Sequence, residues 1–296
     1  MMNGRTHHPH IDGAEHSRSN GHHQVYSLND YPDLVLVIQS DGLRCLHPMR
    51  SHVDIPGKAE YMHALSIYHH HVLEETGIKT DIVAYGRRGL EKYLDPAVVE
   101  QYAQTASIRR RLQIPRWTSS VTCRLGGKLW ERYKQGEYEA GTDTLPEGMG
   151  FLSSLPYPVV LTRMPDGIAT EEPSPSIARE ISSAFTVLQH AYRDRDMEIA
   201  AMRVPCGFEQ GVALYLSADI GNPFDTIVFV AGSIESGCPQ RNLASTLQGL
   251  VRKMEAEGQP AEIPFDTARD VADGMPTYFL EVTGMTLEEF SSANLR

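Results

Sequence analysis

The chain has little cysteine and no paired cysteine motif. Its 296 residues include four cysteines, which lie far apart at Cys45, Cys123, Cys206 and Cys238. No two of them form the C-x-x-C spacing of a zinc knuckle, and four isolated thiols do not indicate a disulfide framework. The sequence therefore predicts reduced thiols in a cytoplasmic protein.

Long apolar runs and an excess of positive charge are also missing. No apolar stretch approaches the roughly 20 residues that a membrane span requires, and the N-terminus lacks the apolar core of a signal peptide. The 27 Lys and Arg residues against 38 Asp and Glu give a formal charge of −11, which argues against nucleic acid or an anionic membrane as partner. We expect a small-molecule substrate, and an anionic one would need a local basic pocket.

The first 20 residues are polar and show no hydrophobic period. They are rich in His, Gly, Asn and Ser, a composition that cannot bury enough apolar surface to fold. We predict a mobile arm over residues 1–20, whose histidines bind metal only adventitiously.

What the chain does contain is a mixture of short strand and helix patterns. Residues 34–38 form a continuous apolar run of strand length. Pro56-Gly57 opens a helix with apolar positions at the 3.6-residue period, and Gly77 predicts its end. Residues 78–85 suit another strand, and the charged stretch through Arg111 is typical of a helix.

After a predicted hinge at residues 114–116, a second set of elements begins. Ser174-Pro175 is a favourable N-cap and N1 pair for a helix. The apolar runs 212–217 and 227–230 are separated by the turn residues Gly221-Asn222-Pro223, which predicts a hairpin. The other expected elements are a strand near 120–125, a helix through Trp130 and Tyr133, and helices near 242–257 and 266–282.

Strands and helices follow one another without a strict βαβ rhythm and without an internal repeat. We therefore predict an α+β fold with largely antiparallel sheets and flanking helices. The expected parts are the arm (1–20), an N-terminal β-rich lobe (21–116) and a C-terminal α+β lobe (117–296).

Residues 130–158 carry the strongest signal for a known family. They are WERYKQGEYEAGTDTLPEGMGFLSSLPYP, which resembles the W-K-E-Y helix, T-G-x-x-x-G turn and L-P-E-G…L-P-x-P segment of the SAICAR synthetase family of purine biosynthesis. Further segments resemble motifs of that family in the same order, at residues 20–26, 40–47, 55–58, 207–211 and 264–284. The resemblance implies a two-lobed fold with a cleft between a nucleotide lobe and a substrate lobe.

The family joins aspartate to a phosphorylated carboxylate with ATP and magnesium, and this chain differs where that chemistry is expected. By resemblance, Gly21 and His22 are the remnant of the nucleotide-binding loop, with His22 in the place of a lysine. Gly232 and Ser233 stand in the place of an acidic pair that holds the metal. Because phosphoryl transfer depends on such charges, we expect no ATP, magnesium or other cofactor.

The expected substrate site is basic. Gly127 and Lys128 open a helix, where free N–H groups, the helix dipole and an ammonium can hold an anion; a tight turn with a solvated lysine is the alternative. A guanidinium suits phosphate or carboxylate, although Arg241 is equally compatible with the surface, and a local ion pair between Asp41 and Arg44 would hold a turn. The expected substrate-binding set is Asp41, Arg44, Arg124, Gly127, Lys128 and Arg241.

Glu209 is the preferred acid–base residue, because it is an isolated carboxylate in a small, apolar segment where burial would raise its pKa. A structural carboxylate that accepts backbone hydrogen bonds is the alternative. His47 lines the cleft by resemblance, together with His22 and His23, and one of these can act as acid or base. Lys128 completes the expected catalytic set.

Two other features favour structure over catalysis. The run His69-His70-His71 cannot converge on one metal ion, since successive residues of a helix point about 100° apart. We interpret these three as helix-surface histidines. Cys206 lacks an identified base and is interpreted as a small core residue rather than a nucleophile.

The sequence thus predicts a diverged SAICAR synthetase-like enzyme of specialised, natural-product metabolism. It would act on a small anionic substrate by cyclisation, elimination or condensation, through orientation and acid–base help. One alternative is an ATP-dependent ligase that joins an amine to a carboxylate, with magnesium held by Glu171, Glu172 or Glu235. Another is a ligand-binding pseudoenzyme, and each of these is compatible with a homo-oligomer.

Overall fold

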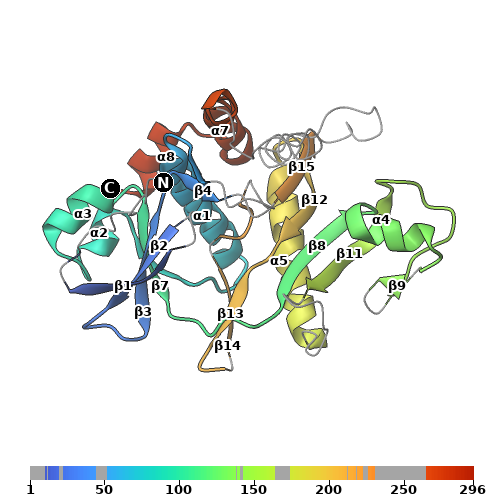
Figure 1. The fold of residues 1–296 in the computed structure, drawn as a ribbon, viewed down its shortest axis with the longest axis horizontal. Coiled ribbons are helices and arrows are strands. Elements are labelled where there is room, and N and C mark those ends of the chain that lie inside the picture. Colours follow the sequence, from blue (N-terminus) through green and yellow to red (C-terminus); the bar gives the residue numbers. More distant parts are fainter. Residues whose placement is uncertain are drawn as a thin grey trace, which may run out of the picture.

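Two antiparallel sheets, one in each lobe, form the frame of the molecule (Figure 1). The computed structural model describes residues 11, 13–19, 23–44, 52–137, 139–140, 143–163, 174–211, 213–217, 219–222, 226–230 and 265–296. The sheet of the first lobe has the strand order β1-β2-β3-β7-β6. Its strands are β1 (Ala14–Ser19), β2 (His23–Leu28), β3 (Leu34–Gln39), β6 (Ile82–Tyr85) and β7 (Ala106–Arg110).

The second lobe is built on a sheet with the order β11-β8-β12-β15, antiparallel between all neighbours. Its strands are β8 (Thr118–Arg124), β11 (Ser154–Arg163), β12 (Met197–Arg203) and β15 (Thr226–Val230). Helix α5 (Pro175–Arg193) packs on this sheet. The side chain of Ser174 accepts a hydrogen bond from Ile177 N, and Pro175 stands at the first helical position, as the sequence predicts.

Helix α1 (Lys58–Glu74) lies between the lobes (Figure 1), and most of its side chains are buried or partly buried. It packs against β3 of the first sheet and against α5 of the second lobe. Because of this position, its buried residues include Lys58, His63 and His69 as well as apolar side chains.

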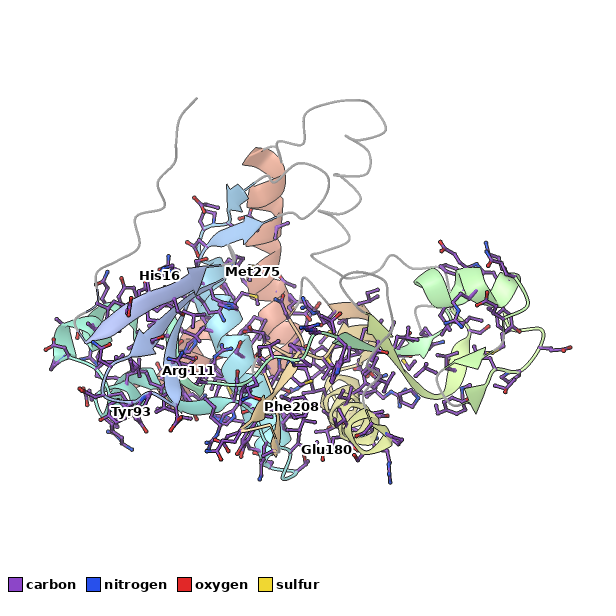
Figure 2. All side chains as sticks on the ribbon, turned by 60° about the horizontal axis from the view of Figure 1, so that its bottom comes forward. His16, Tyr93, Arg111, Glu180, Phe208 and Met275 are labelled. Carbon is purple, nitrogen blue, oxygen red and sulfur yellow. The ribbon has the colours of Figure 1, made fainter. Side chains whose placement is uncertain are left out.

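The end of the chain returns to the first lobe. Helices α7 (Phe265–Thr283) and α8 (Leu287–Asn294) both pack on α1, and Figure 2 shows α7, which carries Met275, standing beside α1. The main core cluster accordingly mixes residues of both halves, such as Leu65, Phe185 and Phe279. The remaining short elements are α2 (Gly86–Leu90), α3 (Pro96–Tyr102), α4 (Gly127–Lys134), β4 (Gly42–Arg44), β5 (His52–Asp54), β9 (Glu139–Ala140) and β10 (Asp143–Thr144).

The hairpin predicted from residues 212–217 and 227–230 is wrong. β14 (Ala213–Leu216) pairs with β13 (Cys206–Glu209), and β15 pairs with β12. The tight turn of the real hairpin begins at Gln210-Gly211, where both residues have positive φ values of 50° and 74°, a conformation that is common in hairpin loops. Figure 2 shows this hairpin, labelled at Phe208, between the lobes.

Two other sequence predictions need correction. Residues 14–19, assigned to a mobile arm, form β1, which is ordered by main-chain pairing with β2 rather than by an apolar face of its own. The charged stretch through Arg111 is helical only in α2 and α3, and it ends in the inner strand β7. The strand was missed because its arginines suggested an exposed helix, whereas one of them, Arg109, is buried and ion-paired. The strand expected at 78–85 covers only 82–85, helix α8 was not predicted, and residues 242–257 lie outside the described part.

Candidate functional site

A partly buried polar cluster lies where the segment after β14 meets the first sheet. The carboxylate of Asp219 accepts hydrogen bonds from Arg109 Nη1 at 3.1 Å and from Gln39 Nε2 at 3.4 Å. The Nδ1 atom of His23 lies 3.7 Å from the same carboxylate. We call these four residues the Asp219 cluster. Gln39 ends β3, Arg109 lies on β7 and His23 begins β2, so three adjacent strands converge on one second-lobe side chain.

Arg109 anchors the cluster from the first sheet. Its side chain is 3% exposed, its Nε donates to Ser107 Oγ at 3.0 Å, and its Nη1 also lies 3.9 Å from Asp81. A buried guanidinium is tolerated only when it is paired and hydrogen-bonded. The carboxylates of Asp219 and Asp81 supply this pairing.

The partners of Asp219 keep its carboxyl group ionised. Burial alone would raise the pKa of the carboxyl group, but the charges of Arg109 and His23 and the hydrogen bonds from Arg109 and Gln39 hold it well below its usual range. Asp219 is therefore ionised at neutral pH and can orient a neighbouring imidazole.

Lys58, at the start of α1, adds a second buried cation to this region. Burial lowers its pKa to about 8, against the opposing attraction of Asp41, Asp219 and Asp54. Its Nζ donates to the carbonyl oxygen of Ser40. A fully buried lysine with a lowered pKa is a frequent mark of a functional site, although a structural ion network can produce the same effect.

Asp41 is occupied by the backbone of α1. Its carboxylate accepts from Gly57 N at 3.3 Å and from Ala59 N at 2.9 Å. The carboxylate thus fills the position at which a helix N-terminus would hold an anion. The ion pair with Arg44 that the sequence offered as the structural alternative stays a prediction, and the partners seen here are backbone N–H groups.

Glu209 is neither isolated nor buried. It accepts from Arg110 Nη1 at 2.7 Å and from the Tyr215 hydroxyl at 3.1 Å, and 36% of its side chain is exposed. The premise that burial activates this carboxylate is therefore wrong, and a catalytic role for Glu209 stays a prediction without support from its surroundings.

Arg124 is engaged with Glu198 in a two-point contact. Its Nε and Nη2 each donate to the Glu198 carboxylate at 2.8 Å, and both side chains are largely buried. A substrate anion would have to displace Glu198 from this geometry. The described contacts do not bring Arg124 together with Asp41.

Most of the other predicted site residues lie beyond the described part of the chain, and three of them lie in described elements. Gly21, His22, His47 and Arg241 lie outside the described residues, as do Gly232, Ser233, Glu171, Glu172 and Glu235. Arg44 belongs to β4, and Gly127 and Lys128 open α4 as the sequence predicts. The side-chain contacts of Arg44 and Lys128 lie outside the description.

The histidine run and Cys206 have structural surroundings, and one prediction about the histidines needs correction. His69 is 1% exposed and not on the surface, and its Nε2 shares a 3.1 Å hydrogen bond with the Tyr192 hydroxyl. His70 and His71 bind Thr80 and Tyr85. Cys206 is buried, and burial raises the pKa of its thiol to about 12, so it is a core residue and not an activated nucleophile.

Within the described ranges, no group of three or more His, Cys, Asp and Glu side chains is arranged to hold a metal ion. The best-placed carboxylates, Asp219 and Asp41, are already bound by Arg109 and by the backbone of α1. These residues therefore do not by themselves provide the oxygen cage that magnesium requires. Nor does any helix in this part of the chain have the length and apolar character needed to cross a membrane.

The two lobes, with antiparallel sheets and a helix between them, define a two-lobed α+β fold. No protein-family model and no curated protein matches the chain, but solved structures do. A SAICAR synthase from Saccharomyces cerevisiae, in complex with SAICAR, has a TM-score of 0.76 and 14% identity over 94% of this chain and 97% of its own. A SAICAR synthetase in complex with ADP (0.61, 14%, 91% and 98%) and one from Pyrococcus horikoshii (0.59, 14%, 92% and 98%) are also similar.

The fold is therefore that of the SAICAR synthetases, and the predicted fold class is confirmed. The sequence motifs did not reveal the Asp219 cluster. Two signals were present: Asp219 closely follows an apolar strand, and Arg109 lies among residues that also satisfy a strand pattern. Neither signal indicates which strands are neighbours, so the convergence is visible only in the structure.

Proposed function

We propose that this chain is a biosynthetic enzyme of SAICAR synthetase-like fold that acts on a small anionic substrate at the Asp219 cluster. The observation that supports this most is the His23–Asp219 pair, in which an ionised, anchored carboxylate faces an imidazole at 3.7 Å. An imidazole oriented by a carboxylate is a common acid–base device.

The pair can move protons without a redox step. With Nδ1 turned to Asp219, Nε2 is the nitrogen that exchanges a proton with the substrate, and Asp219 stabilises the imidazolium that forms. The distance of 3.7 Å exceeds a hydrogen bond, and such contacts often tighten when substrate binds. Proton removal followed by proton return would serve an elimination, a cyclisation or a condensation.

The substrate-binding part of the proposal rests on the sequence. Lys128, Arg44 and Arg241 are the proposed anion contacts, since a guanidinium or an ammonium at a helix start suits phosphate or carboxylate. By resemblance, the nucleotide loop keeps Gly21 but has His22 in the place of a lysine, and Gly232 and Ser233 replace the acidic metal pair. These changes support a reaction of specialised metabolism that differs from ATP-dependent ligation.

The test is turnover in a panel of small phosphorylated and carboxylated metabolites, followed by mass spectrometry. For any compound converted, His23→Gln should lower kcat by about 10²-fold or more, the range for loss of a general acid–base group. His190→Gln, at an exposed position of α5, is the matched control and should turn over normally. Unchanged turnover by His23→Gln would remove His23 from the mechanism.

A ligase is the second candidate, because the fold is shared with a SAICAR synthetase solved with ADP. Titration of ATP with and without magnesium, read by calorimetry, distinguishes the two proposals. Metal-dependent, saturable binding would favour the ligase, with ligands supplied by residues beyond the Asp219 cluster. Tight binding of a metabolite with no product over long incubation would instead indicate a pseudoenzyme.

A further inference from the structure

Three helices meet in a buried chain of polar side chains. His69 of α1 shares a 3.1 Å hydrogen bond with the Tyr192 hydroxyl of α5, and Tyr192 lies 3.4 Å from the Tyr278 hydroxyl of α7. The His69 and Tyr192 rings are stacked, with centroids 6.0 Å apart. All three side chains belong to the core, with exposures of 1%, 0% and 6%. The elements they join come from both halves of the sequence.

The turn that carries Asp219 rests on one end of this chain. A Cβ added to Gly221 would come within 2.4 Å of the His69 ring, and Gly221 has a φ of +73°, so no other residue fits there without strain. The backbone of Ile220 also lies close enough to favour the protonated imidazole, although Nδ1 makes no hydrogen bond of standard geometry. Ile220 N donates to Ser217 O and Asn222 N donates to Asp219 O, so residues 219–222 form a hydrogen-bonded turn.

We propose that His69 is a positioning residue for the Asp219 cluster: by supporting the turn 219–222, it fixes where the Asp219 carboxylate stands. The proposal rests on the proposed function for its catalytic meaning, since the cluster contains the His23–Asp219 pair. Arg109 and Gln39 hold Asp219 by its side chain from the first sheet. The His69 ring contacts the backbone of the same segment at Gly221, so the side chain and the backbone of this segment have separate supports.

The competing explanation is that His69 only fills space in the core. A core-filling role predicts that any apolar side chain of similar size serves equally well. A positioning role predicts that the polar contact with Tyr192 matters, because it fixes the orientation of the ring on which Gly221 rests. Titration of Asp219 separates the two, since the pKa of its carboxyl group reports how closely the cations approach it.

The experiment is a pH titration by carbon NMR of the protein labelled at aspartate carboxyl carbons, with Asp219 assigned from the spectrum of Asp219→Asn. In the native protein Asp219 should stay ionised far below its usual pKa. In His69→Phe and Tyr192→Phe we expect its pKa to rise by about one unit or more, a tenfold change in proton affinity. His69→Gln, whose amide can still bond Tyr192 but which lacks the ring, should raise the pKa less than His69→Phe does.

Tyr85→Phe is the matched control, because it also removes a tyrosine–histidine hydrogen bond from α1, at His71, without contact to the turn. An unchanged Asp219 titration in folded Tyr192→Phe and His69→Phe would overturn the proposal and leave His69 as core packing. This readout needs no substrate. If Asp219 shifts as expected but His23→Gln keeps full turnover, the positioning stands and the proposed chemistry fails; the reverse pattern would retain the chemistry and reject the positioning.

Discussion

Arg109 and Arg110 are adjacent residues of β7 with opposite surroundings. Arg109 is 3% exposed and faces Asp219 and Asp81, whereas Arg110 is 37% exposed and pairs with Glu209 on the other face of the strand. Successive side chains of a strand point to opposite faces. The same residue type therefore serves as a buried anchor at one position and as a surface partner at the next.

The two arginines predict very different costs of truncation. Arg109→Ala leaves the buried Asp81 and the partly buried Asp219 without this cation, and breaking a buried pair costs about 3–5 kcal/mol. Arg110→Ala removes a half-exposed pair, for which about 0–1 kcal/mol is typical. Urea unfolding of both variants measures the difference, with Arg110→Ala as the control for loss of an arginine from β7. Equal free energies of unfolding would show that Arg109 is not the anchor of the cluster.

At the residue scale, the sequence predicted the role of some side chains and not of others. Cys206 was correctly interpreted as core, and Asp41 has a structural role, though as a cap. Glu209 was mistaken for an isolated carboxylate because its partners, Arg110 and Tyr215, cannot be paired with it from spacing alone. A long-range pair such as Arg109–Asp219 depends on which strands are neighbours, and no local pattern encodes that.

Helix α1 carries three histidines whose pKa values are strongly lowered by burial. Burial lowers the pKa of His63 to about 3 and those of His69 and His70 to about 4. Such histidines are neutral in the folded chain and bind protons more readily when unfolded. Their contribution to stability is complete above the unfolded pKa of about 6.5 and is lost as the pH falls below it.

Acid should therefore loosen the packing of α1 before most carboxylates titrate. Between pH 6.5 and 5, each of these histidines should lower the free energy of unfolding by ~2 kcal/mol. We expect His63→Leu to flatten this slope, because it removes one of the titrating groups. No hydrogen bond is lost with it, since neither ring nitrogen of His63 has a partner. The measurement is Tm at pH 7 and pH 5, with exposed His190→Gln as the control. A His63→Leu variant with the native pH slope would refute the assignment.

Helices were predicted better than strand pairings, for a physical reason. The start of α5 and the span of α7 follow from capping residues and local periodicity, which are contained in one stretch of sequence. The partner of β14 was mistaken because Gly221-Asn222-Pro223 resembles a hairpin turn. The described residues 219–222 instead place Asp219 against the first sheet, so the wrong prediction concerns the segment that carries the candidate site.

At the scale of the whole molecule, the two lobes are connected by several segments of the chain. The β13–β14 hairpin contacts the first lobe through Asp81 N, which donates to Leu216 O, and through paired hydrogen bonds between Gln113 and Phe208. The C-terminal residues close on α2, where Arg87 N donates to Leu295 O at 3.0 Å. The candidate site is thus held between segments that are joined at several points.

The C-terminal closure predicts that the last helix stabilises the first lobe. Phe290 and Leu295 are 3% and 1% exposed, and a Cβ at Gly86 would meet the Leu295 backbone at 2.9 Å, so this end of the chain is closely packed. Removing residues 287–296 should cost about 2 kcal/mol for each of these two side chains, in addition to the lost hydrogen bond. The Tm should fall clearly, whereas removal of the exposed Arg296 alone should leave it unchanged. A truncated chain that unfolds at the native temperature would show that α8 rests on the first lobe without supporting it.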